Sequence, residues 1–162
     1  MKLPIFLLLV AILGCGNSTS VNTGSKQPVS VANTSSVRRV NINQTKTFGG
    51  LDVTIGEIAI EPGKITVGMT LKNPTKETLT AFPDQGDLLI GSKQLESNLF
   101  MATGKLGGEI HAGIEKSGSL AFLDPNNSVD PSTLTSIDLK LGTVYGKSLM
   151  KTTDVHWTIG LP

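Results

Sequence analysis

The side chain best suited to covalent chemistry is the thiol of Cys15, the only cysteine in the chain. A cysteine thiolate is a nucleophile, and alkylation converts it to a stable thioether. Gly14 stands immediately before it and lets a peptidase approach the backbone at that bond. Their types and their adjacency make this pair the candidate site of covalent chemistry in the chain. With its one cysteine used in this way, the domain that follows depends on a hydrophobic core instead of disulfides.

An uninterrupted apolar run from Pro4 to Leu13 leads into this pair, and Lys2 supplies a positive charge before it. Ten residues at 1.5 Å rise reach about 15 Å, half of the ~30 Å hydrocarbon core of a bilayer, so the run is too short for a permanent span. A basic start, a short apolar centre and a small residue before the cut are typical of an export signal. The alternative is an ordinary secretory signal with a chance cysteine near its cleavage site.

The residues Ile12-Leu13-Gly14-Cys15 resemble the lipobox of bacterial lipoproteins, although Leu13 is bulkier than the residue usual at its position. The resemblance implies a diacylglyceryl thioether on Cys15, palmitate-type acyl chains, and cleavage after Gly14. It also implies that the chain lies on the extracytoplasmic face of a bacterial cell membrane, or of the outer membrane if the host is Gram-negative. Two or three acyl chains on one residue would give stable anchoring, whereas one chain binds only marginally.

The charge of the remaining chain is balanced, with thirteen basic and thirteen acidic residues once Lys2 is removed with the leader. A nucleic-acid partner would require a basic face, so we expect none. Only seven residues are aromatic, while Gly, Ser and Thr are abundant, which favours short strands over helices. We expect a monomer.

Composition divides the chain into three parts: a signal peptide at 1–14, the lipidated Cys15 with a tether at 15–39, and one domain at 40–162. Residues 16–37 are mostly Ser, Thr, Asn, Gly, Gln and Pro without hydrophobic periodicity, so we expect a flexible tether. Arg38-Arg39 ends it and is expected to be a solvated entry to the first strand.

From residue 40 onward, apolar and polar residues alternate over short stretches, as in half-buried strands. The phase slips between Ile55 and Ile58, which predicts a β-bulge at 56–57. Pro62-Gly63 predicts a type II turn, and Gly91-Ser92 predicts a two-residue hairpin of type II′. The strands are expected at 51–60, 65–71, 77–82, 88–90, 93–95, 119–123, 137–141 and 155–159. Eight short strands without a helical period predict an all-β fold, an antiparallel sandwich.

Three stretches carry a second resemblance: Lys72-Asn73-Pro74, Gly91-Ser92-Lys93 and the strand from Lys116 to Phe122. Together they resemble a family of immunoglobulin-like domains of unknown function. Such domains occur in exported lipoproteins, chiefly of Gram-positive bacteria, and are similar in fold to a secreted mycobacterial antigen. The resemblance implies an Ig-like β-sandwich over roughly residues 40–160. The family has no assigned catalytic residues, so it implies none here.

The histidines are the remaining residues with chemistry of their own. On an extended chain His111 shares a face with Glu109, and His156 with Asp154. A zinc or copper site needs three or four converging donors, and the sequence fixes no third ligand for either pair. No Gly-x-Ser-x-Gly elbow is present. We therefore expect no metal, no cofactor and no enzymatic activity. Trp157 lies in phase between Val155 and Ile159, so we expect it in the core.

The stretch from Met101 to Gly118 is rich in glycine and interrupts the strand alternation. Binding residues often lie on loops carried by a rigid scaffold, so this stretch is the candidate interaction segment. Its candidate contact residues are Thr103, Gly104, Lys105, Gly107 and Gly108. The alternative is a passive crossing between the sheets with Leu99, Phe100 and Leu106 tucked under it.

These observations predict a lipid-anchored, extracytoplasmic binding or structural module of the bacterial cell envelope. Its contacts would be the membrane, through acylated Cys15, and an envelope protein. Two alternatives remain open: an envelope enzyme whose site is assembled only in three dimensions, and a metal carrier.

Overall fold

The computed structural model describes residues 37–146 and 152–162. The predicted signal peptide, the Gly14–Cys15 cleavage site and nearly all of the predicted tether lie outside the described residues. Within those two ranges, no helix is long and apolar enough to cross a membrane.

Ten strands and one short 3₁₀ helix, η1 (Pro83–Gln85), follow one another along the described chain. The strands are β1 (Arg38–Phe48), β2 (Leu51–Glu61), β3 (Lys64–Lys72), β4 (Leu79–Ala81), β5 (Asp87–Ile90), β6 (Lys93–Glu96), β7 (Gly108–Ile110), β8 (Glu115–Leu123), β9 (Ser136–Tyr145) and β10 (Thr152–Gly160).

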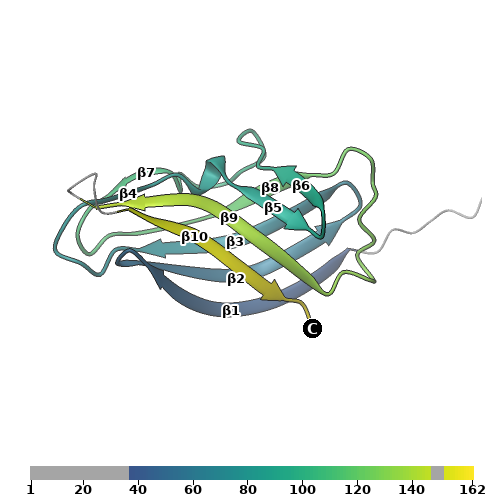
Figure 1. Cartoon of the computed structure of the whole chain (residues 1–162), viewed down its shortest axis with the longest axis horizontal. Coiled ribbons are helices and arrows are strands. Elements are labelled where there is room, and N and C mark those ends of the chain that lie inside the picture. The colour runs from purple at the N-terminus through teal and green to yellow at the C-terminus, as the bar shows by residue number, and fades with distance from the viewer. Residues whose placement is uncertain (1–36, 147–151) are drawn as a thin grey trace, which may run out of the picture. The chain divides into compact units, whose positions relative to one another are not determined.

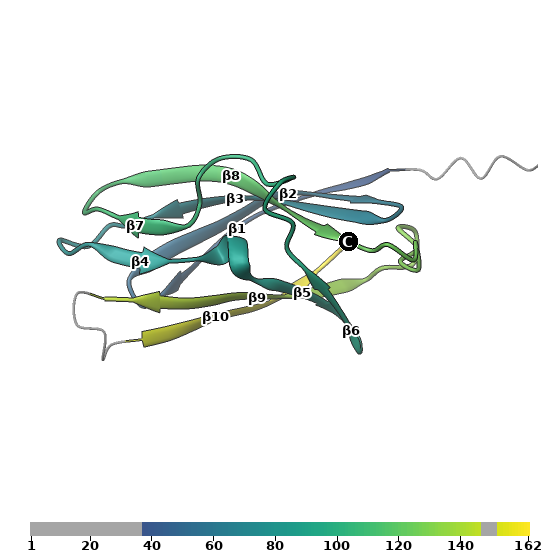
Figure 2. The same ribbon diagram turned by 90° about the horizontal axis from the view of Figure 1, so that it is seen from above.

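The strands form two antiparallel sheets packed face to face (Figures 1 and 2). One sheet has the order β1-β2-β3-β8; the other has the order β6-β5-β9-β4-β7, with β10 paired to β9. In an Ig fold, strands A, B and E share one sheet while C, F and G share the other. Here β2, β3 and β8 take the first set of places, and β5, β9 and β10 take the second. The predicted all-β, Ig-like antiparallel sandwich is confirmed.

The core consists of the apolar side chains that alternate inward from both sheets. Ile65, Val67 and Leu71 of β3 are buried, in the phase that their spacing predicts. Trp157 on β10 is only 2% exposed, so its predicted place in the core is confirmed. Its ring centroid lies 6.2 Å from that of Phe48 on β1, a contact that joins the two sheets.

The predicted bulge and both predicted turns are present. Ile55 pairs with Met69 and Ile58 with Val67, so β2 carries one extra residue between these two positions. Gly63 has φ +75° and Gly91 has φ +58°, the left-handed conformation that each turn requires. The β5–β6 hairpin closes with Ile90 paired to Lys93, as predicted.

The strands differ from the prediction in several places: β1 is an additional strand, β9 and β10 extend beyond the predicted 137–141 and 155–159, and the bounds of β8 and β4 also differ. β8 begins at Glu115 instead of residue 119, because Lys72 at the end of β3 pairs with Glu115 and extends the ladder over residues without apolar alternation. β4 spans only Leu79–Ala81 instead of residues 77–82, since η1 begins at Pro83. A short strand, β7, also lies inside the segment predicted to be irregular.

Arg38 does not fit the predicted solvated entry. β1 begins at this residue, and its guanidinium donates hydrogen bonds to the carbonyl oxygens of Pro131 (3.1 Å), Leu134 (2.7 Å) and Pro162. The side chain therefore joins the first strand to the β8–β9 connection and to the last residue. Its neighbour Arg39 is exposed and pairs with Glu57, as a solvated residue would.

Asn73 explains one of the motifs on which the family resemblance rests. Its side chain is fully buried, and its amide donates to the carbonyl oxygens of Glu77 (2.7 Å) and Ile110 (2.8 Å). Its own side-chain oxygen accepts from the backbone and hydroxyl of Thr75. A buried amide with its hydrogen bonds made fixes the path of the chain. The Lys-Asn-Pro motif thus has a structural role in the β3–β4 connection.

Candidate functional site

The first part of the candidate interaction segment, with the residues just before it, runs along the free edge of β8, the outermost strand of its sheet, and residues 115–118 of the segment belong to β8 itself. Thr103 and Ser119 exchange two backbone hydrogen bonds (2.9 and 3.0 Å), and their hydroxyls lie 2.8 Å apart. Farther along, the Asn98 amide donates to the Ala121 carbonyl at 2.7 Å. An uncovered edge strand offers unpaired backbone groups to other chains, and this connection covers them.

The glycines of this segment allow close packing. A Cβ on Gly118 would collide with the Thr103 carbonyl oxygen, and one on Gly104 would collide with the Ser117 carbonyl. Gly107 lies under the carboxylate of Asp84, where a Cβ would be 2.5 Å from Oδ1. The glycines therefore mark close contacts of the segment with its neighbours: backbone against backbone at β8, and Gly107 against the Asp84 side chain of η1.

The alternative prediction, that the segment covers three apolar side chains, is correct for only one of them. Leu106 is 1% exposed and belongs to the core. By contrast, Leu99 is 57% exposed and Phe100 is fully exposed at 101%, and the adjacent Met101 is 45% exposed. Leu99, Phe100 and Met101 form the apolar tip of the β6–β7 connection, which projects at the top of Figure 1. Among the candidate contact residues, Thr103, Gly104 and Lys105 are also exposed.

Asn98 fixes the backbone of the apolar tip. Its side-chain oxygen accepts from the amides of Phe100 (3.0 Å) and Met101 (3.3 Å). Its carbonyl accepts from the amides of Met101 and Ala102, both at 3.1 Å. The turn is thus held by one polar residue, and the three apolar side chains are free to point outward.

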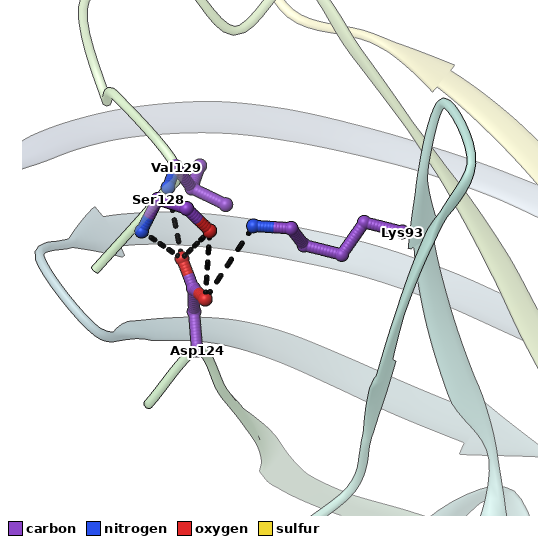
Figure 3. Close-up of polar contacts among 4 residues, drawn as sticks. All are labelled: Lys93, Asp124, Ser128 and Val129. Carbon is purple, nitrogen blue, oxygen red and sulfur yellow. Dashed lines mark hydrogen bonds and ion pairs between the residues drawn. The ribbon is translucent and has the colours of Figure 1, made fainter. Parts of the chain in front are cut away.

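A second cluster lies where the β5–β6 hairpin meets the β8–β9 connection (Figure 3). Asp124 is 2% exposed, and its Oδ2 accepts from the backbone amides of Ser128 (2.7 Å) and Val129 (2.8 Å). The Ser128 hydroxyl lies 3.1 Å from both carboxylate oxygens. Lys93 reaches across from the hairpin, with Nζ 3.5 Å from Oδ1.

The surroundings of Asp124 keep it ionised. Burial by itself raises the pKa of the carboxyl, but hydrogen bonds from Val129 and Ser128 and the charge of Lys93 outweigh burial and bring the pKa below its ordinary value. A carboxylate in this state accepts hydrogen bonds and holds no proton near neutral pH. We therefore assign it to closure of the loop between β8 and β9.

Two open hollows lie on either side of Lys93. One, of about 460 Å³, is bordered by Lys93, Asn98 and Asp124; the other, of about 480 Å³, is bordered by Lys93, Ser128 and Thr133. The Lys93 side chain is one-third exposed, and its ammonium group is the cation that both hollows share. This arrangement is absent from the sequence prediction because Lys93 and Asp124 lie far apart in the chain. The Gly91-Ser92 hairpin signal is the only local indication of where Lys93 would lie.

The histidines lie on the surface. His111 Nδ1 is 3.2 Å from the Thr78 hydroxyl, and His156 Nε2 is 3.9 Å from Asp138 Oδ1. Asp154, the predicted companion of His156, instead accepts a hydrogen bond from Thr143 at 2.7 Å. Within residues 37–146 and 152–162, no group of three or more His, Cys, Asp or Glu side chains is placed to hold a metal ion.

The two sheets and their connections define an Ig-like sandwich. Among the described residues, its exposed large apolar side chains lie outside the strands. No protein-family model matches the chain, and no curated protein matches it. Several solved structures are similar in fold to this chain, among them three from Listeria and Bacillus species. A functionally unknown protein from Listeria monocytogenes is 17% identical, with a TM-score of 0.57 over 78% of this chain and 88% of its own.

The other two similar structures come from Bacillus species. The yjhA protein from Bacillus subtilis is 11% identical, with a TM-score of 0.51 over 76% of this chain and 99% of its own. A conserved hypothetical protein from Bacillus anthracis is 14% identical, with a TM-score of 0.50 over 78% of this chain and 97% of its own. At these identities the likeness concerns the fold alone.

Proposed function

We propose that this protein is a lipid-anchored, extracytoplasmic binding or structural module of the bacterial cell envelope. The observation that carries the proposal is Cys15 at the end of the apolar run from Pro4 to Leu13, directly after Gly14. Acylated Cys15 is the anchor, and the chain up to Val37 links the anchor to the sandwich. Palmitate-type chains on one residue keep the protein on the membrane.

The geometry of the sandwich supports a module that presents fixed surfaces. Its β6–β7 connection is bonded to β8 through Thr103 and Asn98, so the exposed residues there keep a defined position. Contact residues on a preorganised loop lose less conformational entropy on binding than the same residues on a flexible loop would. Thr103, Gly104 and Lys105 are the exposed members of the candidate contact residues for an envelope protein.

The anchor is tested in the native host by labelling with an alkyne fatty acid, followed by mass spectrometry of the N-terminus. We expect wild-type protein to carry label on Cys15 and to fractionate with membranes. Cys15→Ala should remain unlabelled and accumulate as the uncleaved precursor. A wild-type N-terminus downstream of Cys15 without lipid would refute the proposal.

The binding role is tested by placing a photo-crosslinking amino acid at Lys105 of the lipidated protein in intact cells. The same amino acid at Lys72, which is exposed at the end of β3, is the matched control. We expect a specific adduct from position 105 only. Identical adducts from both positions would indicate random collision and would contradict a binding surface on the β6–β7 connection. The test changes one residue at a time and leaves Gly104 and Gly107 in place, because a Cβ at either glycine would collide with a neighbouring residue.

A further inference from the structure

The apolar tip places three consecutive large apolar side chains where the fold does not require them. The Phe100 side chain is fully exposed, and Leu99 and Met101 keep about half of their surface in contact with solvent. The Asn98 side chain and carbonyl supply the hydrogen bonds of the turn, so polar residues would serve the backbone equally well. Contiguous exposed apolar surface on a folded domain usually marks an interaction site.

The tip is held rigidly on both sides. Before it, the Asn98 amide is bonded to Ala121 of β8; after it, Thr103 is bonded in both directions to Ser119. Gly118 lets the two backbones approach closely enough for this pairing. The backbone on both sides of Phe100 is therefore bonded to the edge strand. The fixed geometry keeps the apolar side chains directed away from the core.

The shape of the tip and its covalent position in the chain favour a lipid surface as its occupant. A short convex projection with one aromatic and two flexible apolar side chains suits insertion at the bilayer interface, where aromatic residues are enriched. Val37 lies 22 residues after Cys15, and a chain of that length spans at most about 80 Å. An anchored domain stays within this distance of the bilayer, so even weak insertion is favoured by the high effective concentration.

We propose that Leu99, Phe100 and Met101 insert into the interface of the membrane that holds Cys15, and thereby fix the orientation of the domain on the bilayer. This inference rests on the proposed lipid anchor. The protein would then contact the membrane at two points. The acyl chains would retain the protein, and the apolar tip would determine which side of the sandwich faces the lipid.

The test uses the mature lipidated chain reconstituted into vesicles of phosphatidylcholine and phosphatidylglycerol, with lipids brominated on the acyl chain as fluorescence quenchers. Phe100→Trp reports on the tip, and Ile114→Trp, another exposed apolar position in the β7–β8 turn, is the control. Trp157 is buried in the core and contributes background fluorescence, which is measured separately with wild-type protein. Because both substituted side chains are exposed, both variants should keep the wild-type fold, which circular dichroism checks.

We expect the emission of Phe100→Trp to shift to the blue and to fall about twofold or more in brominated vesicles, with little change for Ile114→Trp. Equal quenching at both positions, or none at position 100, would overturn the inference and leave a protein partner as the occupant of the tip. Sedimentation of the same vesicles separates the two proposals. Lipidated protein that sediments without quenching at position 100 refutes only the insertion, whereas failure to find lipid on Cys15 refutes the anchor.

Discussion

Two connections of this sandwich are closed by a short polar side chain, with opposite consequences for their surroundings. In the β8–β9 connection, Asp124 is buried and ionised, and it accepts from the amides of Ser128 and Val129 beside Lys93. In the β6–β7 connection, Asn98 is only half-buried and accepts from the amides of Phe100 and Met101. The first connection encloses a charge, and the second exposes apolar side chains.

The comparison distinguishes a connection that stabilises the fold from one that exposes side chains for contact with other molecules. Removing Asp124 would take the charged acceptor away from the backbone amides of Ser128 and Val129, so we expect the β8–β9 connection to be part of the cooperative fold. The cap in the β6–β7 connection is reached by water, and the residues it positions contribute little to the core. A loop of the second kind can change its exposed side chains without changing the fold, which is the property expected of an interaction surface.

Among substitutions of the polar side chains that close the two connections, the largest effect should come from Asp124→Ala, which leaves two backbone amides and Lys93 without their acceptor. We expect the free energy of unfolding to fall by about 2–4 kcal/mol, measured by urea denaturation followed by circular dichroism. The control is Asp130→Ala, which removes an exposed carboxylate bonded to Ser132 and should cost clearly less. Equal losses in the two variants would contradict the assigned importance of burial.

The same carboxylate should make stability depend on pH in a defined direction. The folded pKa of Asp124 lies below its ordinary value, so its contribution is complete above the unfolded pKa, about 3.9, and is lost as the pH falls through the folded pKa. We expect the difference in unfolding free energy between wild type and Asp124→Asn to shrink as the pH falls below about 4. A difference that stays constant from neutral pH to strong acid would refute this assignment.

Gly118→Ala tests the support on which the apolar tip rests. The added Cβ meets the Thr103 carbonyl, so β8 and the connection must separate. We expect a loss of about 1–3 kcal/mol, the range for overpacked sites, and faster hydrogen exchange at the Thr103 amide. Gly160→Ala, where a Cβ meets open space, is the control. If the Thr103 amide in Gly118→Ala exchanges at the wild-type rate, the pairing of Thr103 with Ser119 does not depend on this glycine.

Asn98→Ala should have a smaller effect than Asp124→Ala, about 1 kcal/mol, because water can reach the amides that lose their acceptor. Hydrogen exchange should accelerate at Phe100 and Met101 while the core strands keep their protection. If the loss instead matched that of Asp124→Ala, the contrast between the two connections would not hold.

The smallest effect should come from Phe100→Ser. Its side chain is fully exposed, so the free energy of unfolding should stay within about 0.5 kcal/mol of wild type. Leu106→Ala, in the same connection but 1% exposed, should cost about 2–5 kcal/mol. Thermal or urea denaturation of the pair measures both. A large loss in Phe100→Ser would mean that the apolar tip packs against the domain.

Local features of the sandwich could be predicted from the sequence because each depends on neighbouring residues. Alternation from Ile65 to Leu71 defines the buried face of β3, and the slip from Ile55 to Ile58 locates the bulge. Gly63 and Gly91 mark turns because only glycine adopts positive φ readily. The leader at 1–14, which ends at Gly14 just before Cys15, is a sequence prediction of the same local kind and lies outside the described residues.

Contacts between connections were decided only by the tertiary structure. Nothing in an apolar trio within a turn indicates whether it is covered, and the alternative that places Leu99 and Phe100 under the chain is wrong for both, because both are exposed. The pairings of Lys93 with Asp124 and of Thr103 with Ser119 join residues from separate strands and loops. Periodicity specifies which face of an element is apolar, whereas the packing of the two sheets determines which loops meet and which side chains remain in solvent.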